Sequence, residues 1–566
     1  MKFHTWSHLP RAARASGRPR TLGVLIEGLW DGYHGTLFDS IVRAAREHGV
    51  SVIAFVGGQL PFSLFDLVGK QNVDGIIVVA STVAQRVGPA GLAEYCDSKS
   101  PLPLCTIGVA VPGVPAIIAT GSHGVQALVQ HLIQDHGCRR LAFIEGLGEE
   151  GKERYEAFAA AVRASGAELN QELVVPGRFT TFSGADAIRI LFEDRRVEFD
   201  AVVAADDDMA LGAMNALEAR GKVVPDDVAV VGFDDIYQAR HAVVPLTTVR
   251  QPLREMGRRA VEVVLRQVAG HEPRPVDPIV CHPIKRRSCG CVVESPFTRR
   301  PSTLPEPDTD AVAALMERRQ LVLADMLRAG QGELDDVGYH WEERLFDAVV
   351  DELRGASSAP FLSANEELAR RIARTSGDVS MWQSVLSALR SHVLDCIGGV
   401  QKLRSVAENG FHDAFLVSAN VVGREESRRR ADLERLLRTS VKTSNELATS
   451  AEAAELGPVL MRHLIALGIP SAYASLITDG PQQRARLLLG YDRQLPVERV
   501  TATDTFPAVQ LVPEGMLPTE RNTVSVVMPF LAGTQLRGLV LVEYEGGNAT
   551  LFEALGEQIG GVLLPE

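Results

Sequence analysis

The first half of the chain alternates short apolar runs with amphipathic helical stretches. The run at 21–27 is followed by a stretch whose helix-spaced face carries Leu37, Ile41, Ala44, Ala45 and His48. Further runs are nearly continuously apolar, as expected for parallel strands that helices cover on both faces. These runs lie at 50–56, 75–79, 102–107, 141–145, 201–205 and 228–232. The pattern predicts a doubly wound α/β architecture, in which ligands bind at the carboxyl ends of the strands.

The pattern changes after residue 291. Residues 292–309 are rich in Pro, Ser and Thr and predict a linker, and residues 310–422 predict a helical region. A connecting signalling helix is predicted over 423–444, with leucines at near-heptad spacing over only about two heptads. Residues 445–566 predict a small α+β domain that opens with a helix, continues as a meander of strands and closes with a helix over 551–563.

Composition narrows the class of protein. A chain of 566 residues with 46% hydrophobic and 23% charged residues predicts several globular domains. No run approaches the roughly 18 apolar residues of a membrane helix, and a net charge of −13 disfavours a dominant nucleic-acid surface.

The amino terminus and the cysteines bear on the compartment. Residues 1–20 are basic and predict a disordered leader, with a weak nucleic-acid or membrane-surface arm as the alternative. The leader lacks the apolar stretch of a secretory signal, and seven scattered cysteines then predict reduced thiols in the cytoplasm.

Three motifs carry a family resemblance. The segment 129–144, with Val129-Gln-His-Leu-Ile followed by Arg139-Arg-Leu-Ala-Phe-Ile, is the first. The others are Val203-Ala-Ala-Asp-Asp-Asp-Met and Val228-Ala-Val-Val-Gly-Phe-Asp-Asp235, the last leading to Pro245-Leu-Thr-Thr-Val-Arg-Gln-Pro252. In this order and spacing, residues 21–291 resemble the sensor domain of LacI/GalR-type regulators, which has the fold of type I periplasmic binding proteins.

The resemblance implies two lobes with an effector cleft between them. Arg154, Asp206 and Asp234 match positions that contact the effector in that family. The other lobe would contribute the loop after the first strand and the residue after the strand 75–79. The ligand-binding residues expected from both lobes are Trp30, Asp31, Tyr33, His34, Ser81, Arg154, Asp206 and Asp234.

These residue types suit a polar ligand without reference to the family. Carboxylates and an Arg fork can hold several hydroxyls in fixed directions, while an aromatic ring stacks on an apolar face. The alternative for Asp206 and its two acidic neighbours is a cap on the helix that begins near Met209. The alternative for Trp30 and Tyr33 is simple lid packing.

The sequence departs from the family in two ways. Residues 119–121 are Ala-Thr-Gly where the family has Asp-Asn, which leaves the ligand class open. The twenty residues before the first strand are too few for the family's helix-turn-helix domain, so direct DNA binding is not supported by that route.

Two glycine- or cysteine-containing segments offer weaker signals. Gly146-Leu-Gly-Glu-Glu-Gly151 fits a dinucleotide fingerprint, but it is misplaced within the domain and carries two Glu, so we read it as a tight helix entry. Ser288-Cys-Gly-Cys291 has two cysteines, whereas a structural zinc site needs four ligands. The segment therefore predicts a domain terminus, with a redox switch as the alternative. We expect no cofactor and no metal site.

Residues 445–566 resemble a GAF domain. The evidence is the run Val524–Ala532 paired with Gln535–Glu543, which in that fold lie side by side. No kinase, cyclase or Ser-His-Asp arrangement is found, so we expect a protein that is not an enzyme.

The sequence therefore predicts a cytoplasmic, homodimeric, ligand-sensing regulator that binds a small polar effector, sugar-like by its carboxylates. The conformational change on closure of the cleft would be transmitted to the GAF-like domain and to a separate output protein. The alternatives are a DNA-binding LacI-family regulator and the sensor half of a kinase or cyclase that lacks its output domain.

Overall fold

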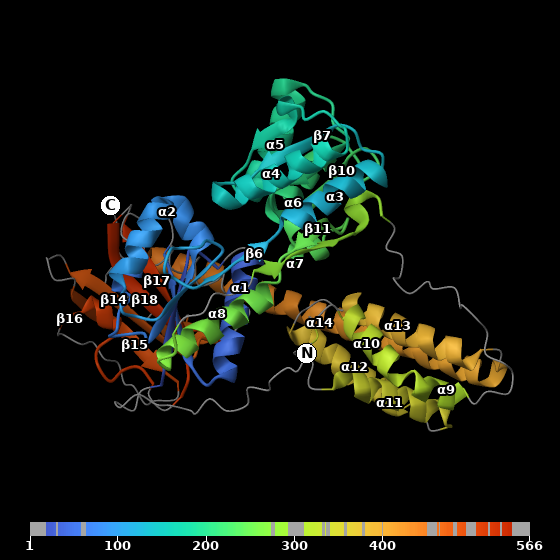
Figure 1. Ribbon diagram of the computed structural model, residues 1–566. Coiled ribbons are helices and arrows are strands. Elements are labelled where there is room, and N and C mark those ends of the chain that lie inside the picture. Colours follow the sequence, from blue (N-terminus) through green and yellow to red (C-terminus); the bar gives the residue numbers. More distant parts are fainter. Residues whose placement is uncertain are drawn as a thin grey trace. The chain divides into compact units, whose positions relative to one another are not determined.

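The computed structural model places two compact units, residues 1–290 together with 436–566, and residues 291–435 (Figure 1). Residues 1–18 of the predicted leader over 1–20, the predicted linker over 292–309 and the predicted closing helix lie outside the described residues. Among the helices that the structure describes, none combines the length and apolar character needed to cross a bilayer. The described residues are 19–29, 32–57, 64–272, 278–291, 311–330, 334, 340–355, 359–375, 380–398, 400–449, 461–462, 464–478, 484–493, 505–518, 521–532 and 535–545.

The first lobe is built on parallel strands in the order β2-β1-β3-β4-β5. The apolar runs become these strands because every residue of β1 to β4 is buried, between helices that cover the sheet. Their bounds are β1 Thr21–Ile26, β2 Ser51–Val56, β3 Gly75–Val79, β4 Leu104–Ile107 and β5 Ala116–Ile117, with helices α1 Gly32–Glu47, α2 Ala80–Ser98 and α8 Leu253–Val268.

The second lobe has its own sheet in the order β13-β11-β10-β9-β7-β8, parallel except for β13. Two short strands, β6 and β12, pair in parallel where the chain passes between the lobes. The predicted doubly wound α/β fold of the first half is thus confirmed. The strands are β6 Ala119–Thr120, β7 Leu141–Glu145, β8 Val174–Pro176, β9 Ala201–Ala204, β10 Ala229–Asp234, β11 Thr247–Arg250, β12 Ile279–Val280 and β13 His282–Ile284, and the helices are α3 Ser122–Gln134, α4 Gly148–Ala164, α5 Thr181–Arg189, α6 Asp207–Glu218 and α7 Tyr237–Arg240.

The carboxy-terminal strands continue the sheet of the first lobe. Strand β17 pairs in parallel with β2, with Val526 opposite Ala54, so one ten-stranded sheet runs from β16 to β5. Figure 1 shows these red strands beside the blue ones. The predicted pairing of 524–532 with 535–543 is confirmed as an antiparallel hairpin, whereas the predicted separate domain shares its core with the first lobe. The bounds are β14 Ser471–Thr478, β15 Arg484–Asp492, β16 Thr505–Pro507, β17 Val524–Ala532 and β18 Gln535–Glu543.

The second unit is helical, as predicted, and has an apolar core of its own. At its centre, buried Asn365 accepts from Trp382 Nε1 at 2.8 Å and donates to the Ala414 carbonyl at 2.9 Å, which satisfies a buried amide. The predicted connecting helix is the later part of a single helix of 49 residues. The helices are α9 Ala311–Glu317, α10 Arg319–Ala329, α11 Trp341–Leu353, α12 Ala359–Thr375, α13 Ser380–Ile397 and α14 Gln401–Thr449.

Helices α5 and α6 cross at a contact that requires glycine. A Cβ at Gly212 would lie 1.9 Å from the Thr181 carbonyl oxygen, which is a backbone atom and cannot move aside alone. We expect Gly212→Ala to lower the free energy of unfolding by about 1–3 kcal/mol, the usual cost of overpacking. Urea titration would measure it.

The matched control is Gly423→Ala in α14, where a Cβ meets nothing within 4 Å. Because alanine is the better helix former, that change should be neutral or stabilise by up to about 1 kcal/mol. Equal effects at Gly212 and Gly423 would contradict the close helix contact.

Candidate ligand cleft

A cavity lies between the two lobes, at the carboxyl ends of the strands. The space between its walls, with the adjoining open solvent included, is about 410 Å³. Both lobes contribute to its wall, since Gly108 follows β4 of the first lobe and Gln251 follows β11 of the second. The lining residues are Gly108, Ile118, Ala119, Gly121, Glu150, Glu153, Arg154, Phe233, Gln251 and Met256.

Arg154 is the central polar side chain of this wall. It points inward from α4, is 7% exposed, and donates from Nη1 to the Ala205 carbonyl at 2.6 Å. Its guanidinium lies 3.8 Å from the centre of the Phe233 ring, a cation–π contact. Burial by itself would lower the Arg154 pKa, but the charges of Asp234, Glu150 and Asp206 outweigh it and raise the pKa. The side chain therefore stays a cation in the cleft.

Asp234 ends β10 next to this cation. Its Oδ1 lies 4.0 Å from Arg154 Nη2 and accepts from Gln251 Nε2 at 2.5 Å. Burial raises the Asp234 pKa to about 7, while Arg154 and Gln251 oppose the rise. The backbone of Asp234 has φ of 115°, a strained conformation that L-residues rarely adopt and that persists only where the surrounding structure holds it. Its carboxyl group is thus poised to change charge near neutral pH.

Glu150 is a wall residue that the sequence did not single out. Its Oε2 lies 3.9 Å from Arg154 Nη2, one helical turn away on α4. A Cβ at Gly108 would come within 3.2 Å of both the Glu150 carboxylate and the Ser81 hydroxyl, so these two side chains converge there from opposite lobes. Burial raises the Glu150 pKa, and Arg154 opposes the rise. A carboxylate held in this way can accept hydrogen bonds from ligand hydroxyls.

The first-lobe residues predicted from sequence lie near the same place. His34 and Ser81 are buried, and Tyr33 is half-buried at the start of α1. The Tyr33 pKa is raised by burial first, and then by the charges of Glu150 and Asp234. The other two predicted residues of this lobe, Trp30 and Asp31, lie outside the described residues.

Asp206 is engaged as a helix cap. Its Oδ1 accepts from the Met209 backbone N–H at 2.8 Å, at the amino terminus of α6. It is 5% exposed, and burial followed by the charge of Asp234 raises its pKa well above the usual range. Capping of α6 thus accounts for one of the two Asp206 carboxylate oxygens. Contact of Asp206 with a ligand stays a prediction.

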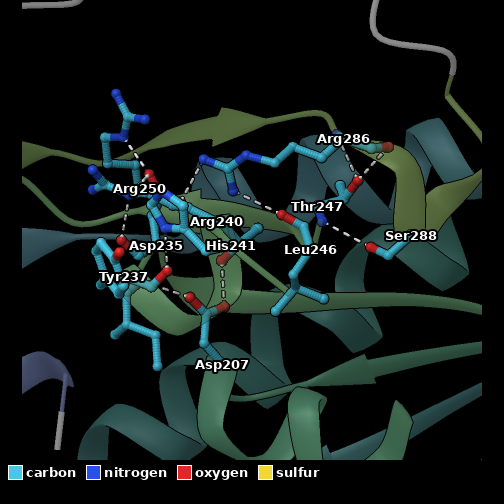
Figure 2. A network of polar contacts seen from close by, with 12 residues as sticks. Asp207, Asp235, Tyr237, Arg240, His241, Leu246, Thr247, Arg250, Arg286 and Ser288 are labelled. Atoms are coloured by element: carbon cyan, nitrogen blue, oxygen red, sulfur yellow. Dashed lines mark hydrogen bonds and ion pairs between the residues drawn. The ribbon is translucent and has the colours of Figure 1, made fainter. Parts of the chain in front are cut away.

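Asp207 and Asp235, the acidic neighbours of Asp206 and Asp234, belong to a network of polar contacts within the second lobe (Figure 2). Asp207 accepts from the Ile236 N–H and from the Thr248 hydroxyl. The fully buried Asp235 carboxylate pairs with three arginines that surround it, namely Arg240 at 3.2 Å, Arg250 at 2.5 Å and Arg286 at 2.7 Å. These cations lower the Asp235 pKa although burial opposes them. The network fixes the β10–α7 turn beside the site.

Arg286 anchors the end of the domain to this network. Besides its ion pair with Asp235, it donates from Nη1 to the Leu246 carbonyl at 2.7 Å. We expect Arg286→Met to lower the free energy of unfolding by about 1.5–3 kcal/mol, the cost of hydrogen bonds to a charged group. The neighbouring exposed Arg287→Met should change it by less than about 0.5 kcal/mol. Chemical denaturation compares the two variants, and similar values would contradict the assigned role.

The glycine-rich segment before Arg154 serves packing. A Cβ at Gly146 would lie 2.1 Å from the Phe179 ring, and one at Gly151 would lie 2.2 Å from the Gly146 carbonyl oxygen. Each glycine therefore permits a close approach within the protein itself. This agrees with the reading of the segment as a tight entry to α4.

Of the lining residues, only Arg154 was predicted from sequence as a ligand contact, and the missed ones include Phe233, Met256 and Gln251. Phe233 reads as a core residue of β10, and Met256 as a core residue of α8. Gln251 had a usable signal, because it lies in the Pro245–Pro252 motif directly after a strand.

Comparison with known proteins agrees with this architecture. Residues 129–289 match the model of the periplasmic binding protein-like domain. The chain is similar to the HTH-type transcriptional regulator CelR of Thermobifida fusca, with 37% identity over 212 residues that cover 36% of this chain and 60% of that protein. It is also similar to the HTH-type transcriptional repressor PurR of Vibrio vulnificus, with 28% identity over 263 residues, 45% of this chain and 76% of that protein.

Among solved structures, a transcriptional regulator CelR–cellobiose complex is similar at 29% identity and a TM-score of 0.43, over 48% of this chain and 86% of that one. The chain spans about three fifths of the length of CelR. The matched residues 129–289 therefore form a periplasmic-binding-protein-like domain, and the curated relatives that the chain resembles are HTH-type transcriptional regulators.

Proposed function

We propose that this protein is a ligand-responsive regulator that binds a small polyhydroxylated molecule, a sugar, in the cleft between its lobes. The observation that carries the proposal is the wall made by Arg154, Glu150 and Gln251 around a cavity with an aromatic ring at one side. A guanidinium donates, a carboxylate accepts and an amide does both, so together they match hydroxyls that donate and accept. Phe233 offers an apolar surface beside them.

We infer the route of signalling from the sheet that the first lobe and the carboxy-terminal strands share. Strand β17 of the carboxy-terminal region is hydrogen-bonded to β2 of the first lobe, so the region would move with that lobe when the cleft closes. A ligand shifts this equilibrium only by binding the closed state more tightly than the open one. We propose that the carboxy-terminal region, as a GAF-like module, passes this change to a separate output protein, and that the protein acts in the cytoplasm as a homodimer.

The test is a binding screen on the full chain. Thermal unfolding is followed with mono- and disaccharides, cellobiose and ribose among them, and hits are confirmed by calorimetry. A sugar at 100 times its dissociation constant should stabilise the folded chain by about 2.7 kcal/mol. Glu150→Gln should weaken binding about 10- to 100-fold, the value of a hydrogen bond to a charged group.

The matched control is Glu156→Gln, an exposed glutamate on the same helix, which should leave the affinity unchanged. Equal sugar affinities of the two variants would show that the sugar does not bind in the cleft. No response to any sugar would overturn the proposed ligand class.

A further inference from the structure

Four metal-binding side chains meet at the end of the sensor domain, away from the Arg154 cleft. His131 comes from α3 and His136 from the loop after it, while Cys289 and Cys291 flank the glycine that ends the domain. One ligand atom from each of the four lies within 4.8 Å of every other. His131 and Cys289 are buried, and the other two are more exposed. Three of the ligands belong to the sensor unit, and the fourth is the residue that directly follows it in the chain.

Two separations within the cluster are close to the edges of a tetrahedral zinc site. The Nε2 atoms of His131 and His136 are 3.1 Å apart, and Cys289 Sγ lies 3.6 Å from His131 Nε2. Zinc bonds of about 2.0–2.1 Å to nitrogen and about 2.3 Å to sulfur give tetrahedral edges of roughly 3.3 Å between nitrogens and roughly 3.6 Å between nitrogen and sulfur. The two observed separations thus fit one central ion.

The surroundings also have the form of a metal site. His131 Nδ1 lies 2.5 Å from Asp135 Oδ2, the carboxylate contact that orients a ligating imidazole and leaves Nε2 for the metal. Lys285 Nζ lies 3.6 Å from the same carboxylate oxygen. Gly290 has φ of 100°, and a Cβ there would lie 3.0 Å from His136 Nδ1, so the turn that presents both cysteines needs glycine.

We propose that His131, His136, Cys289 and Cys291 form a structural Zn²⁺ site. Two thiolates and two imidazoles in a tetrahedral arrangement are the donor set that selects zinc. The ion would fasten the last turn of the sensor domain to α3, the first helix of the second lobe. The segment Ser288-Cys-Gly-Cys291 reads from sequence as a domain terminus because two cysteines are half of a zinc site, and the two histidines come from a segment about 150 residues earlier.

The test measures metal on the full chain. The protein is incubated with ZnCl₂ under reducing conditions, dialysed, and its zinc content determined by mass spectrometry. We expect one zinc per chain in the wild type, and loss of that zinc in Cys289→Ser and in Cys291→Ser. Cys138→Ser, a buried cysteine outside the four, should keep one zinc. Co²⁺ in place of zinc should give the intense visible bands of a tetrahedral ion with thiolate ligands.

A variant that alters the zinc site without removing a ligand separates a loss of zinc affinity from misfolding. Asp135→Asn leaves all four ligands and should weaken zinc affinity about 10- to 100-fold, measured by competition with a chromogenic chelator. A zinc content near zero in the reconstituted wild type would overturn the proposal. So would a Cys289–Cys291 disulfide found by thiol titration in the freshly purified protein, or equal zinc loss in Cys138→Ser and Cys289→Ser.

Discussion

Replacing Arg154 with alanine is expected to abolish effector binding and to lower the free energy of unfolding by about 3–5 kcal/mol at neutral pH. The guanidinium is buried beside Asp234 and Glu150, at 4.0 and 3.9 Å. Removing one partner of a buried charge cluster leaves the other charges without compensation, which is why the cost is large. Arg163→Ala, an exposed arginine on the same helix, is the control and should cost less than about 1 kcal/mol.

The loss of stability in Arg154→Ala should depend on pH. The Asp234 pKa is about 7 in the folded protein against 3.8 as the ordinary value, so the folded state binds more protons between these values. Stability from this group is therefore greatest at low pH and is lost as the pH rises toward 7. Without Arg154 the Asp234 pKa would rise further, and the loss would continue above pH 7.

The pH dependence supplies the measurement. Denaturant titrations at pH 6 and pH 8 should show a larger difference between wild type and Arg154→Ala at pH 8, by up to about 1.4 kcal/mol, because one proton changes the free energy of unfolding by at most about 1.4 kcal/mol per pH unit and the wild type already loses about half of that range. The double variant Arg154→Ala with Asp234→Asn should lose most of this dependence. A difference that is the same at both pH values would contradict a direct coupling between the two side chains.

Most of the two-lobed fold could be predicted because its strands are continuous apolar runs. The run at 75–79 coincides with β3, and the run at 141–145 with β7. Strands that are buried on both faces consist almost entirely of apolar residues, so they can be recognised from composition alone. The lengths of the helices between them then favour parallel crossovers, which leave few topologies open.

Family motifs singled out Arg154 in helix α4 and Asp234 at the end of β10, whereas the rotation of α4 decided which of two neighbouring glutamates faces the cavity. Arg154 and Asp234 were predicted and lie together in the structure. Glu149 and Glu150 are equivalent in sequence, yet only Glu150 lines the cavity, because the first turn of α4 turns one inward and leaves the other exposed. Local pattern carries no information on that rotation.

The pairing of β17 with β2 could not be predicted. Both are apolar strands, but about 470 residues separate them, and the sequence pattern does not say which exposed edge a strand will join. The carboxy-terminal strands therefore looked like a separate domain. In the structure their addition covers the edge that β2 would otherwise expose.

Because the sheet is shared, we also expect a large loss of stability when Tyr544, a contact between the carboxy-terminal strands and the first lobe, is replaced. Tyr544 follows β18, and its ring centre lies 5.4 Å from that of Phe38 in α1 of the first lobe. Its hydroxyl donates to Asp39 Oδ1 at 2.8 Å. We expect Tyr544→Ala to lower the free energy of unfolding by about 3–5 kcal/mol, the cost of removing a buried aromatic ring. Tyr544→Phe keeps the ring and should lose only about 1 kcal/mol with the hydrogen bond.

The measurement must show where stability is lost as well as how much. Hydrogen exchange followed by peptide can report on β1 and β2 separately from β14 and β18. Because one core joins these strands, Tyr544→Ala should reduce protection in both sets to the same extent. If only β14 and β18 lost protection, the carboxy-terminal strands would be a separate cooperative unit, and lobe movement would have no rigid path through the sheet to the output.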